Sequence, residues 1–151
     1  MIYLLDTDTF IVLLRGTAIT RAKTQRQELL KRAAGKILTT CKKRESEGHL
    51  IGLSAITLAE LEFGLRNGGN PETQQSSLRK VLAPFDQFHF DRADCVQHYG
   101  IIRSRLEAKG RGIGPLDTLI AAHAMALSAI LVTHNTKEFK RIDGLVIEDW
   151  A

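Results

Sequence analysis

The chain has 151 residues, of which 44% are hydrophobic and 25% charged, and a net charge of +4. This size suits one domain with a single hydrophobic core, and the composition excludes a wholly disordered chain. Its two cysteines, Cys41 and Cys95, form no CxxC pair, so we expect reduced thiols rather than a disulfide or a metal site. The longest apolar run, 119–132, is shorter than the roughly 20 residues that span a bilayer, and no basic signal-peptide start precedes Asp6. We expect a single domain over 1–151, soluble and cytoplasmic, with no membrane partner.

Positive charge is concentrated in one segment, 21–44. It contains nine basic residues and one acid, Glu28, a net charge of +8 that leaves −4 for the rest of the chain. Such a segment favours a polyanionic partner, and a solvated helix face kept soluble by Lys and Arg explains it equally well. Few aromatic residues are interleaved, so any contacts would be with phosphates and not with stacked bases.

The first half of the chain predicts two strands and four helices. In chain order these are a strand over 2–6, helices over 7–15 and about 20–47, a strand over 49–54, and helices over 55–66 and 71–82. The first strand is apolar throughout, as buried parallel strands tend to be. We expect Thr7 or Asp8 to cap the first helix and Gly16 to end it, and Gly48 to end the long second helix.

The second half continues to alternate strands with helices. The expected ranges are a strand over 85–90, a long helix to about 109, a helix over 115–128, a strand over 130–133, a short helix over 136–141 and a strand over 145–149. Asp91 is expected to cap the long helix, with Asp94 completing a capping box. No internal repeat or linker interrupts the pattern. The alternation predicts a three-layer α/β/α sandwich on a mainly parallel sheet.

Acidic residues stand where the predicted strands end and helices begin. Asp6 and Asp8 follow the first strand, Asp117 lies in the first turn of a helix, and Asn135 follows a later strand. The carboxyl ends of parallel strands and the adjoining helix starts share one edge of a sheet, where ligands bind. Clustered carboxylates there favour a hard divalent cation. The simpler interpretation is that each acid only caps or stabilises its own helix.

Two glutamates compete for a place at this edge. Glu60 has apolar or small neighbours on a helical wheel, so its charge needs a cation, a metal or another partner. Glu62 lies between Leu58 and Ala59 on the same wheel. The helical pattern therefore does not choose between the two glutamates.

The segment after the strand over 130–133 also allows two interpretations. Asn135 and Glu138 have the spacing of a capping box, or else the Asn135 oxygen or Glu138 faces the attacking water. Of the five histidines only His134 lies near this edge, and none has a ligand spacing such as HxxxH. The chain has no GxSxG, no P-loop and no Cys/His cluster.

Together these segments resemble the PIN-domain ribonucleases, specifically the VapC-type toxins of bacterial toxin–antitoxin pairs. The resemblance covers nearly the whole chain, in the segments IYLLDTD (2–8), LSAITLAELEFG (53–64), IGPLDTLIAAHA (113–124), LVTHNTKEF (131–139) and GLVIEDW (144–150). Each segment is weak alone, but five in this order and spacing are specific. The resemblance implies a PIN-like fold, and it selects Glu60 because the second acid of the family lies four residues before Gly64.

The resemblance implies hydrolysis of RNA phosphodiester bonds by metal-activated water, with Mg²⁺ or Mn²⁺ as the cofactor. Asp6 and Asp117 would hold the ion, Glu60 would bind it directly or through water, and Asn135 would orient the water or the phosphate. The fourth acidic position of the family falls on the neutral Asn135, so one metal ion is expected rather than two. Relatives imply a homodimer and a small VapB-like antitoxin that occupies the active-site groove.

The basic segment is the part that this resemblance explains least. If it binds substrate, Lys31, Arg32 and Lys36 are the candidate RNA-binding residues.

Three alternative functions remain. The first is a catalytically silent PIN fold that binds RNA or a partner. The second is a haloacid-dehalogenase-type phosphotransferase that would use Asp6, although Phe10 stands where that pattern has Thr or Val. The third is a Rossmann-like nucleotide binder, although no glycine-rich turn follows the first strand.

Overall fold

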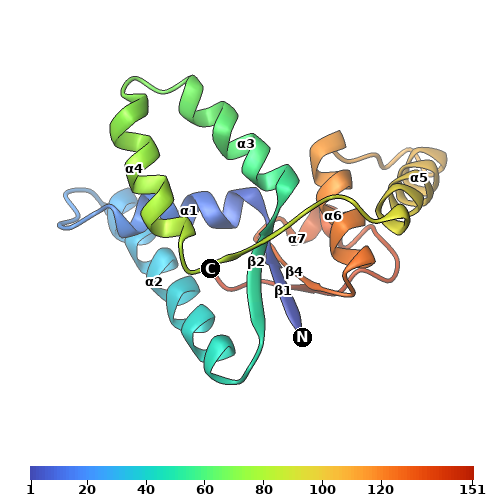
Figure 1. The fold of residues 1–151 in the computed structure, drawn as a ribbon, viewed down its shortest axis with the longest axis horizontal. Helices are drawn as coiled ribbons and strands as arrows, with labels where there is room; N and C mark the ends of the chain where they lie inside the picture. Colours follow the sequence, from blue (N-terminus) through green and yellow to red (C-terminus); the bar gives the residue numbers. More distant parts are fainter.

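A five-stranded parallel sheet forms the centre of the structure, a computed structural model that describes residues 1–151 (Figure 1). The sheet order is β3-β2-β1-β4-β5. The strands are β1 (Ile2–Leu5), β2 (Leu50–Ser54), β3 (Asp86–Phe88), β4 (Ile130–Val132) and β5 (Ile147–Glu148). The helices are α1 (Thr7–Thr17), α2 (Gln25–Ser46), α3 (Ala55–Arg66), α4 (Pro71–Leu82), α5 (Ala93–Ala108), α6 (Pro115–Ala126) and α7 (Thr136–Phe139). None of the helices has both the length and the apolar character of a membrane-spanning segment.

Helices cover both faces of the sheet, which confirms the predicted α/β sandwich. Successive side chains of a strand point to opposite faces, so Tyr3 and Leu5 of β1 pack in one core with α1 to α4, and Leu4 packs in the other with α5 and α6. Figure 1 shows this division, with α1 to α4 on one side and α5 to α7 on the other. All four strand pairings are parallel, so every strand ends at the same edge of the sheet.

The expectations for α1 were wrong at both ends. Its cap is Asp6, whose Oδ1 accepts a hydrogen bond from the Thr9 backbone N–H at 2.8 Å. Gly16 lies inside the helix, which continues to Thr17. A Cβ at Gly16 would come within 2.7 Å of the Leu30 carbonyl oxygen of α2. This glycine therefore permits close packing of two helices, and it does not end the first.

Two other helix starts differ from their prediction. α2 begins at Gln25 rather than near residue 20, because the Thr24 side chain accepts the Gln27 N–H and caps the helix. α5 begins at Ala93 with Arg92 at the cap position and no capping side chain. Asp91 is therefore not the cap, and no capping box forms because the Asp94 carboxylate pairs with Arg92 at 3.1 Å.

Candidate active site

Asp6 lies at the centre of the carboxyl edge of the sheet. It directly follows β1, and its backbone N–H donates to the Val132 carbonyl of β4 at 3.0 Å. Its side chain is only 3% exposed. Besides the bond from Thr9 to Oδ1, the Thr133 hydroxyl donates to Oδ2 at 2.5 Å. Burial raises the pKa of Asp6, and these hydrogen bonds oppose the rise. Capping α1 thus accounts for only one of its two oxygens.

The structure separates the two glutamates that the helical pattern left undecided. Glu60 is partly buried, and its Oε1 accepts a hydrogen bond from the Thr7 hydroxyl of α1 at 2.6 Å. The Thr57 hydroxyl lies 3.1 Å from that of Thr7. Glu62 is exposed and pairs with Arg66 at 2.9 Å, one turn later on the same helix. Glu60 therefore faces the end of β1 and the start of α1, and Glu62 faces solvent.

Asp117 reaches the same edge from the first turn of α6, where Pro115 begins the helix. Its side chain is partly buried, and its pKa is raised to about 6. Burial is the largest cause, and the negative charges of Asp6, Glu60, Asp8 and Glu138 add to it. We call these five residues the acid cluster. None of them forms an ion pair with a basic side chain.

Asn135 is connected to the acid cluster, although not as a capping box. Its side chain accepts no N–H of α7. Its Nδ2 instead donates to Glu138 Oε2 at 2.6 Å, and its backbone N–H donates to the Thr133 hydroxyl oxygen at 3.0 Å. Thr133 therefore links Asn135 to Asp6. The sequence analysis did not assign Thr7 and Thr133 to the site. Their positions could have suggested it, because Thr7 directly follows Asp6 and Thr133 lies two residues before Asn135.

A buried polar contact ties together the elements that carry Glu60 and Asp117. Ser54 ends β2 and caps α3, because its Oγ accepts the Ile56 N–H at 3.1 Å. The same Oγ lies 2.7 Å from Nδ1 of His123 in α6. Burial lowers the pKa of His123, so the Nδ1 of its neutral ring can accept a hydrogen bond from the Ser54 hydroxyl. This contact joins the start of α3 to α6.

The remaining candidates lie elsewhere. His134 is exposed, and its Nδ1 lies 2.9 Å from Asp149. Lys31, Arg32 and Lys36 are on the exposed face of α2, and the Nζ of Lys31 donates to the Thr20 carbonyl at 3.1 Å. The role in RNA binding that the sequence suggested for these three residues stays a prediction.

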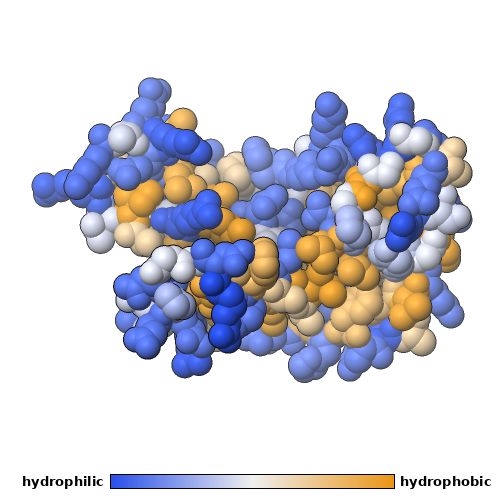
Figure 2. Space-filling view, turned by 90° about the horizontal axis from the view of Figure 1, so that it is seen from above, coloured by the Kyte–Doolittle hydropathy of each residue, from blue (hydrophilic) through white to orange (hydrophobic).

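The acid cluster fits a divalent cation in charge and in the kind of donor. It offers carboxylate oxygens, which Mg²⁺ and Mn²⁺ prefer, without a basic side chain to neutralise them. As the side chains stand, no three Asp, Glu, His or Cys residues are close enough to hold a metal ion. Glu60 and Asp117 would therefore have to turn toward Asp6 to bind one. Seen from above, hydrophilic residues occupy the middle of this face, between the α3–α4 side and the α5–α6 side (Figure 2).

Comparisons with known proteins give a consistent result. The PIN domain model matches residues 3–145. Ribonuclease VapC2 of Rickettsia felis is 44% identical over 105 residues, which are 70% of this chain and 78% of that protein. The tRNA(fMet)-specific endonuclease VapC of Shigella flexneri is 38% identical over 99 residues, 66% of this chain and 74% of that protein. The crystal structure of VapBC2 from Rickettsia felis, bound to a DNA fragment from their promoter, contains a chain that aligns over the full length of both chains, with a TM-score of 0.78 and 35% identity.

Proposed function

Because the chain belongs to the PIN-domain family, and within it to the VapC ribonuclease toxins of toxin–antitoxin systems, we propose that it cleaves RNA with Mg²⁺ or Mn²⁺ at the acid cluster. The observation that carries this proposal is Asp117, whose pKa of about 6 reflects burial beside four other acids. Charge left without a basic partner in this way is a sign of a functional site rather than a structural one. Family membership also excludes the haloacid-dehalogenase-type phosphotransferase and the Rossmann-like nucleotide binder.

Asp6, Asp117 and Glu60 are the residues that would hold the metal ion. When bound, the ion makes an attacking water more acidic and offsets the charge that builds up on the phosphate. The protein contributes orientation. Thr133 holds Asp6 through Oδ2, and Thr7 holds Glu60 through Oε1, so each carboxylate keeps its other lone pairs for a ligand.

Asn135 would orient the water or the phosphate. Its Nδ2 is engaged by Glu138, so its Oδ1 is the atom that remains to accept a hydrogen bond from the attacking water. A neutral Asn135 supplies no fourth carboxylate, which is why we propose a single ion. The charge of Glu138 acts on Asp117 but is held by the Asn135 amide.

A small VapB-like antitoxin is the partner that we propose, with a homodimer as the assembly of the toxin and the cytoplasm as its location. The structural relative from Rickettsia felis is a VapBC complex. An acid cluster without basic partners would accept an Arg from such a protein, since a guanidinium pairs with a carboxylate in a planar, bidentate way. We expect the C-terminal segment of the antitoxin to order on binding and to place an Arg or Lys there.

Cleavage of total RNA by the purified chain tests the proposed function. We expect cleavage with Mg²⁺ and none with excess chelator, and restored cleavage when the ion is added back. Separate assays on the tRNA fraction show whether the substrate class of the Shigella flexneri relative extends to this chain. Equal cleavage with and without the ion would refute the metal-dependent mechanism. No cleavage of any RNA would favour the catalytically silent alternative.

A further inference from the structure

A hollow lined by charged side chains lies between the loop before α6 and the region of α7. It has a volume of about 540 Å³, and none of its lining residues is hydrophobic. We call it the basic pocket, and its lining residues are Gly110, Arg111, Gly112, Lys137, Lys140 and Arg141. Four of the six are cations, and they come from two segments that are far apart in the sequence, the loop before α6 and the region of α7.

The cations of the basic pocket are not neutralised by the fold. None of the four forms an ion pair, and three of them, Arg111, Lys137 and Lys140, are exposed. Arg141 is partly buried, and its Nη1 lies 3.4 Å from the Gly112 carbonyl oxygen, which connects α7 to the loop. Mutual repulsion of four unpaired cations favours binding of an anion.

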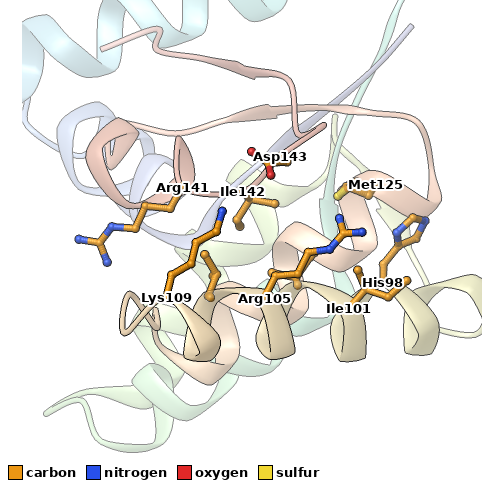
Figure 3. Close-up of a pocket in the computed structure, with 10 residues that line it drawn as sticks. His98, Ile101, Arg105, Lys109, Met125, Arg141, Ile142 and Asp143 are labelled. Atoms are coloured by element: carbon orange, nitrogen blue, oxygen red, sulfur yellow. The ribbon is translucent and has the colours of Figure 1, made fainter.

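The positive surface continues past the basic pocket. Arg105 and Lys109 of the α5 region line an adjoining cavity of about 170 Å³ together with Arg141, as Figure 3 shows. Asp143 is the one acid that lines this cavity, and it forms no ion pair with any of them. In Figure 3 Arg141 extends away from Asp143, toward the outside. Three cations thus line this cavity, and five of its ten lining residues are hydrophobic.

The loop backbone is also open to a ligand. Gly110 has a φ of +63°, which favours glycine, but Gly112 and Gly114 have no such requirement, and a Cβ at either would contact nothing within 4 Å. The backbone N–H groups of Gly112 and Gly114 donate to no backbone acceptor in the protein. Glycine permits close approach of a ligand to such N–H groups, and they are suited to phosphate oxygens.

Both segments of the basic pocket adjoin residues of the acid cluster in the sequence. Gly112 precedes Asp117 by five residues, and Lys137 is the neighbour of Glu138, whose charge reaches Asp117. Five acids repel a polyanion, so a substrate with negative phosphates needs cations close to the point of cleavage. The basic residues of α2 are not adjacent in the sequence to any acid of the cluster.

We propose that the basic pocket binds phosphate groups of the RNA next to the bond that is cleaved. This inference rests on the proposed ribonuclease function and assigns it a substrate-binding surface. It replaces Lys31, Arg32 and Lys36 of α2 as the main phosphate contacts. Phosphate contacts position the RNA and carry no sequence information by themselves.

Two variants with the same change in charge test the inference. In the first, Arg111→Glu, Lys137→Glu and Lys140→Glu are combined; in the second, Lys31→Glu, Arg32→Glu and Lys36→Glu. All six side chains are exposed, and each variant has the same number of cations replaced. Binding of a labelled single-stranded RNA of about 16 nucleotides is measured in chelator over a range of salt concentrations. Cleavage with Mg²⁺ is measured in parallel, and circular dichroism melting confirms that each variant folds.

The pocket variant should bind the RNA at least about tenfold more weakly. The slope of log binding constant against log salt concentration should also become less steep, by about 0.7 for each phosphate that the protein no longer neutralises. The α2 variant should stay within about twofold of the unmodified chain. Equal RNA binding by the pocket variant and the unmodified chain would overturn the inference. Cleavage of RNA by the unmodified chain would still support the proposed ribonuclease function in that case. A pocket variant that keeps RNA binding but fails to co-purify with the antitoxin would also overturn it, because the pocket would then serve the protein partner. An unmodified chain that neither binds nor cleaves RNA would refute the proposed function itself.

Discussion

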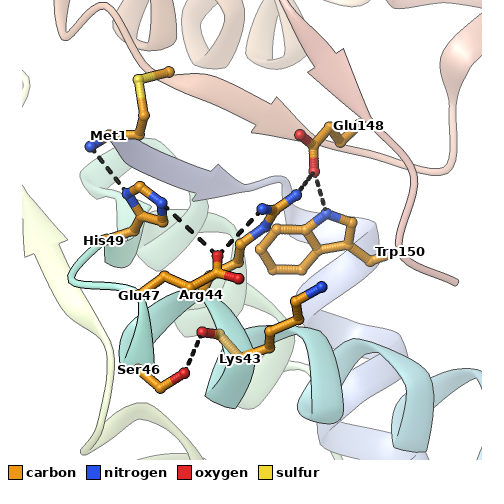
Figure 4. Close-up of polar contacts among 8 residues, drawn as sticks. All are labelled: Met1, Lys43, Arg44, Ser46, Glu47, His49, Glu148 and Trp150. Atoms are coloured by element: carbon orange, nitrogen blue, oxygen red, sulfur yellow. Dashed lines mark hydrogen bonds and ion pairs between the residues drawn. The ribbon is translucent and has the colours of Figure 1, made fainter.

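Two groups of charged side chains near opposite ends of β1 are built in opposite ways. Around the start of β1, Arg44 lies 3.3 Å from Glu47 and 3.4 Å from Glu148, and Trp150 Nε1 donates to Glu148 at 2.7 Å (Figure 4). The guanidinium of Arg44 also lies over the Tyr3 ring, 5.1 Å from its centroid. We call this group the Arg44 cluster. Past the other end of β1 is the acid cluster, in which no charge has an opposite partner.

The difference separates a structural use of charge from a functional one. In the Arg44 cluster the opposite charges connect α2 to β5 and the C-terminal segment, so each charge has an opposite partner within the fold. In the acid cluster the charges repel one another, and burial adds to the cost of ionising Asp117 and Asp6. A protein retains such a cost where a ligand offsets it. Loss of a residue from the acid cluster should therefore affect activity, and loss from the Arg44 cluster should affect stability.

The largest effect is expected for Asp6→Asn and for Asp117→Asn. Each should lower RNA cleavage by about a hundredfold or more, the scale on which losing one electrostatic group lowers kcat. Without metal, Asp117→Asn should melt at the same temperature as the unmodified chain or higher, because a repelling charge is gone. Cleavage rates and thermal melting measure the two effects. Asp91→Asn, at an exposed position without an ion pair, is the matched control, and full activity in either active-site variant would end the assignment.

A smaller but sharper contrast is expected within α3. Glu60→Gln should lower cleavage by about tenfold or more, since it removes a proposed metal-binding charge. Glu62→Gln removes an equal charge from the same helix, but its exposed pair with Arg66 contributes little, so activity and melting should hardly change. Initial rates over a series of Mg²⁺ concentrations distinguish the two. Equal losses of activity in the two variants would show that Glu60 is wrongly chosen over Glu62 as the site residue of α3.

Arg44→Ala should produce the opposite result to the variants of the acid cluster. The guanidinium connects two glutamates and covers the Tyr3 ring, so its loss should lower the melting temperature by several degrees. Cleavage measured well below that temperature should remain close to that of the unmodified chain. Lys43→Ala, one residue earlier in α2 and exposed, is the control for loss of a cation alone. An Arg44→Ala variant that melts normally but cleaves poorly would reverse the comparison.

The stability of the metal-free protein should depend on pH because ionised Asp117 destabilises the folded state. Its folded pKa of about 6 lies above the ordinary value of 3.8, so the folded state holds the proton more tightly than the unfolded one. This contribution to stability is fully present below pH 3.8 and is lost as the pH rises to about 6. It amounts to at most about 3 kcal/mol, and solvent screening of this partly buried group reduces it. Urea unfolding should show that the free energy of unfolding of Asp117→Asn rises relative to that of the unmodified chain as the pH increases across this range. Parallel pH profiles would contradict it.

Local sequence patterns were enough to predict most elements, and α3 and α4 have the predicted bounds. They failed where a neighbour in space decides. Gly16 stands where a helix could end, and only the approach of Leu30 shows that it belongs inside α1. Asp6 was predicted to be a metal ligand, with helix capping as the simpler alternative, and in the structure the Thr9 N–H binds one of its oxygens. A carboxylate has lone pairs for both, and sequence patterns consider one role at a time.

The candidate site shows the same limit. That acids would gather at one edge followed from the parallel sheet, because its strands end together. The choice between Glu60 and Glu62 depended on family resemblance, and in the structure it follows from contact with Thr7. The basic pocket could not be predicted, since two helices and a strand separate Arg111 from Lys140 in the sequence. The nine basic residues of 21–44 form a denser run of positive charge in the sequence than the residues of the basic pocket do.

Metal binding itself tests the central claim most directly, without RNA. Thermal melting is measured with increasing Mn²⁺ or Mg²⁺ for the unmodified chain, Asp117→Asn and Arg44→Ala. A ligand that binds only the folded state raises its stability with concentration. We predict that the ion raises the melting temperature of the unmodified chain and of Arg44→Ala by similar amounts, and leaves that of Asp117→Asn nearly unchanged. An equal rise in all three, or no rise in any, would contradict the assignment of the acid cluster as the metal site.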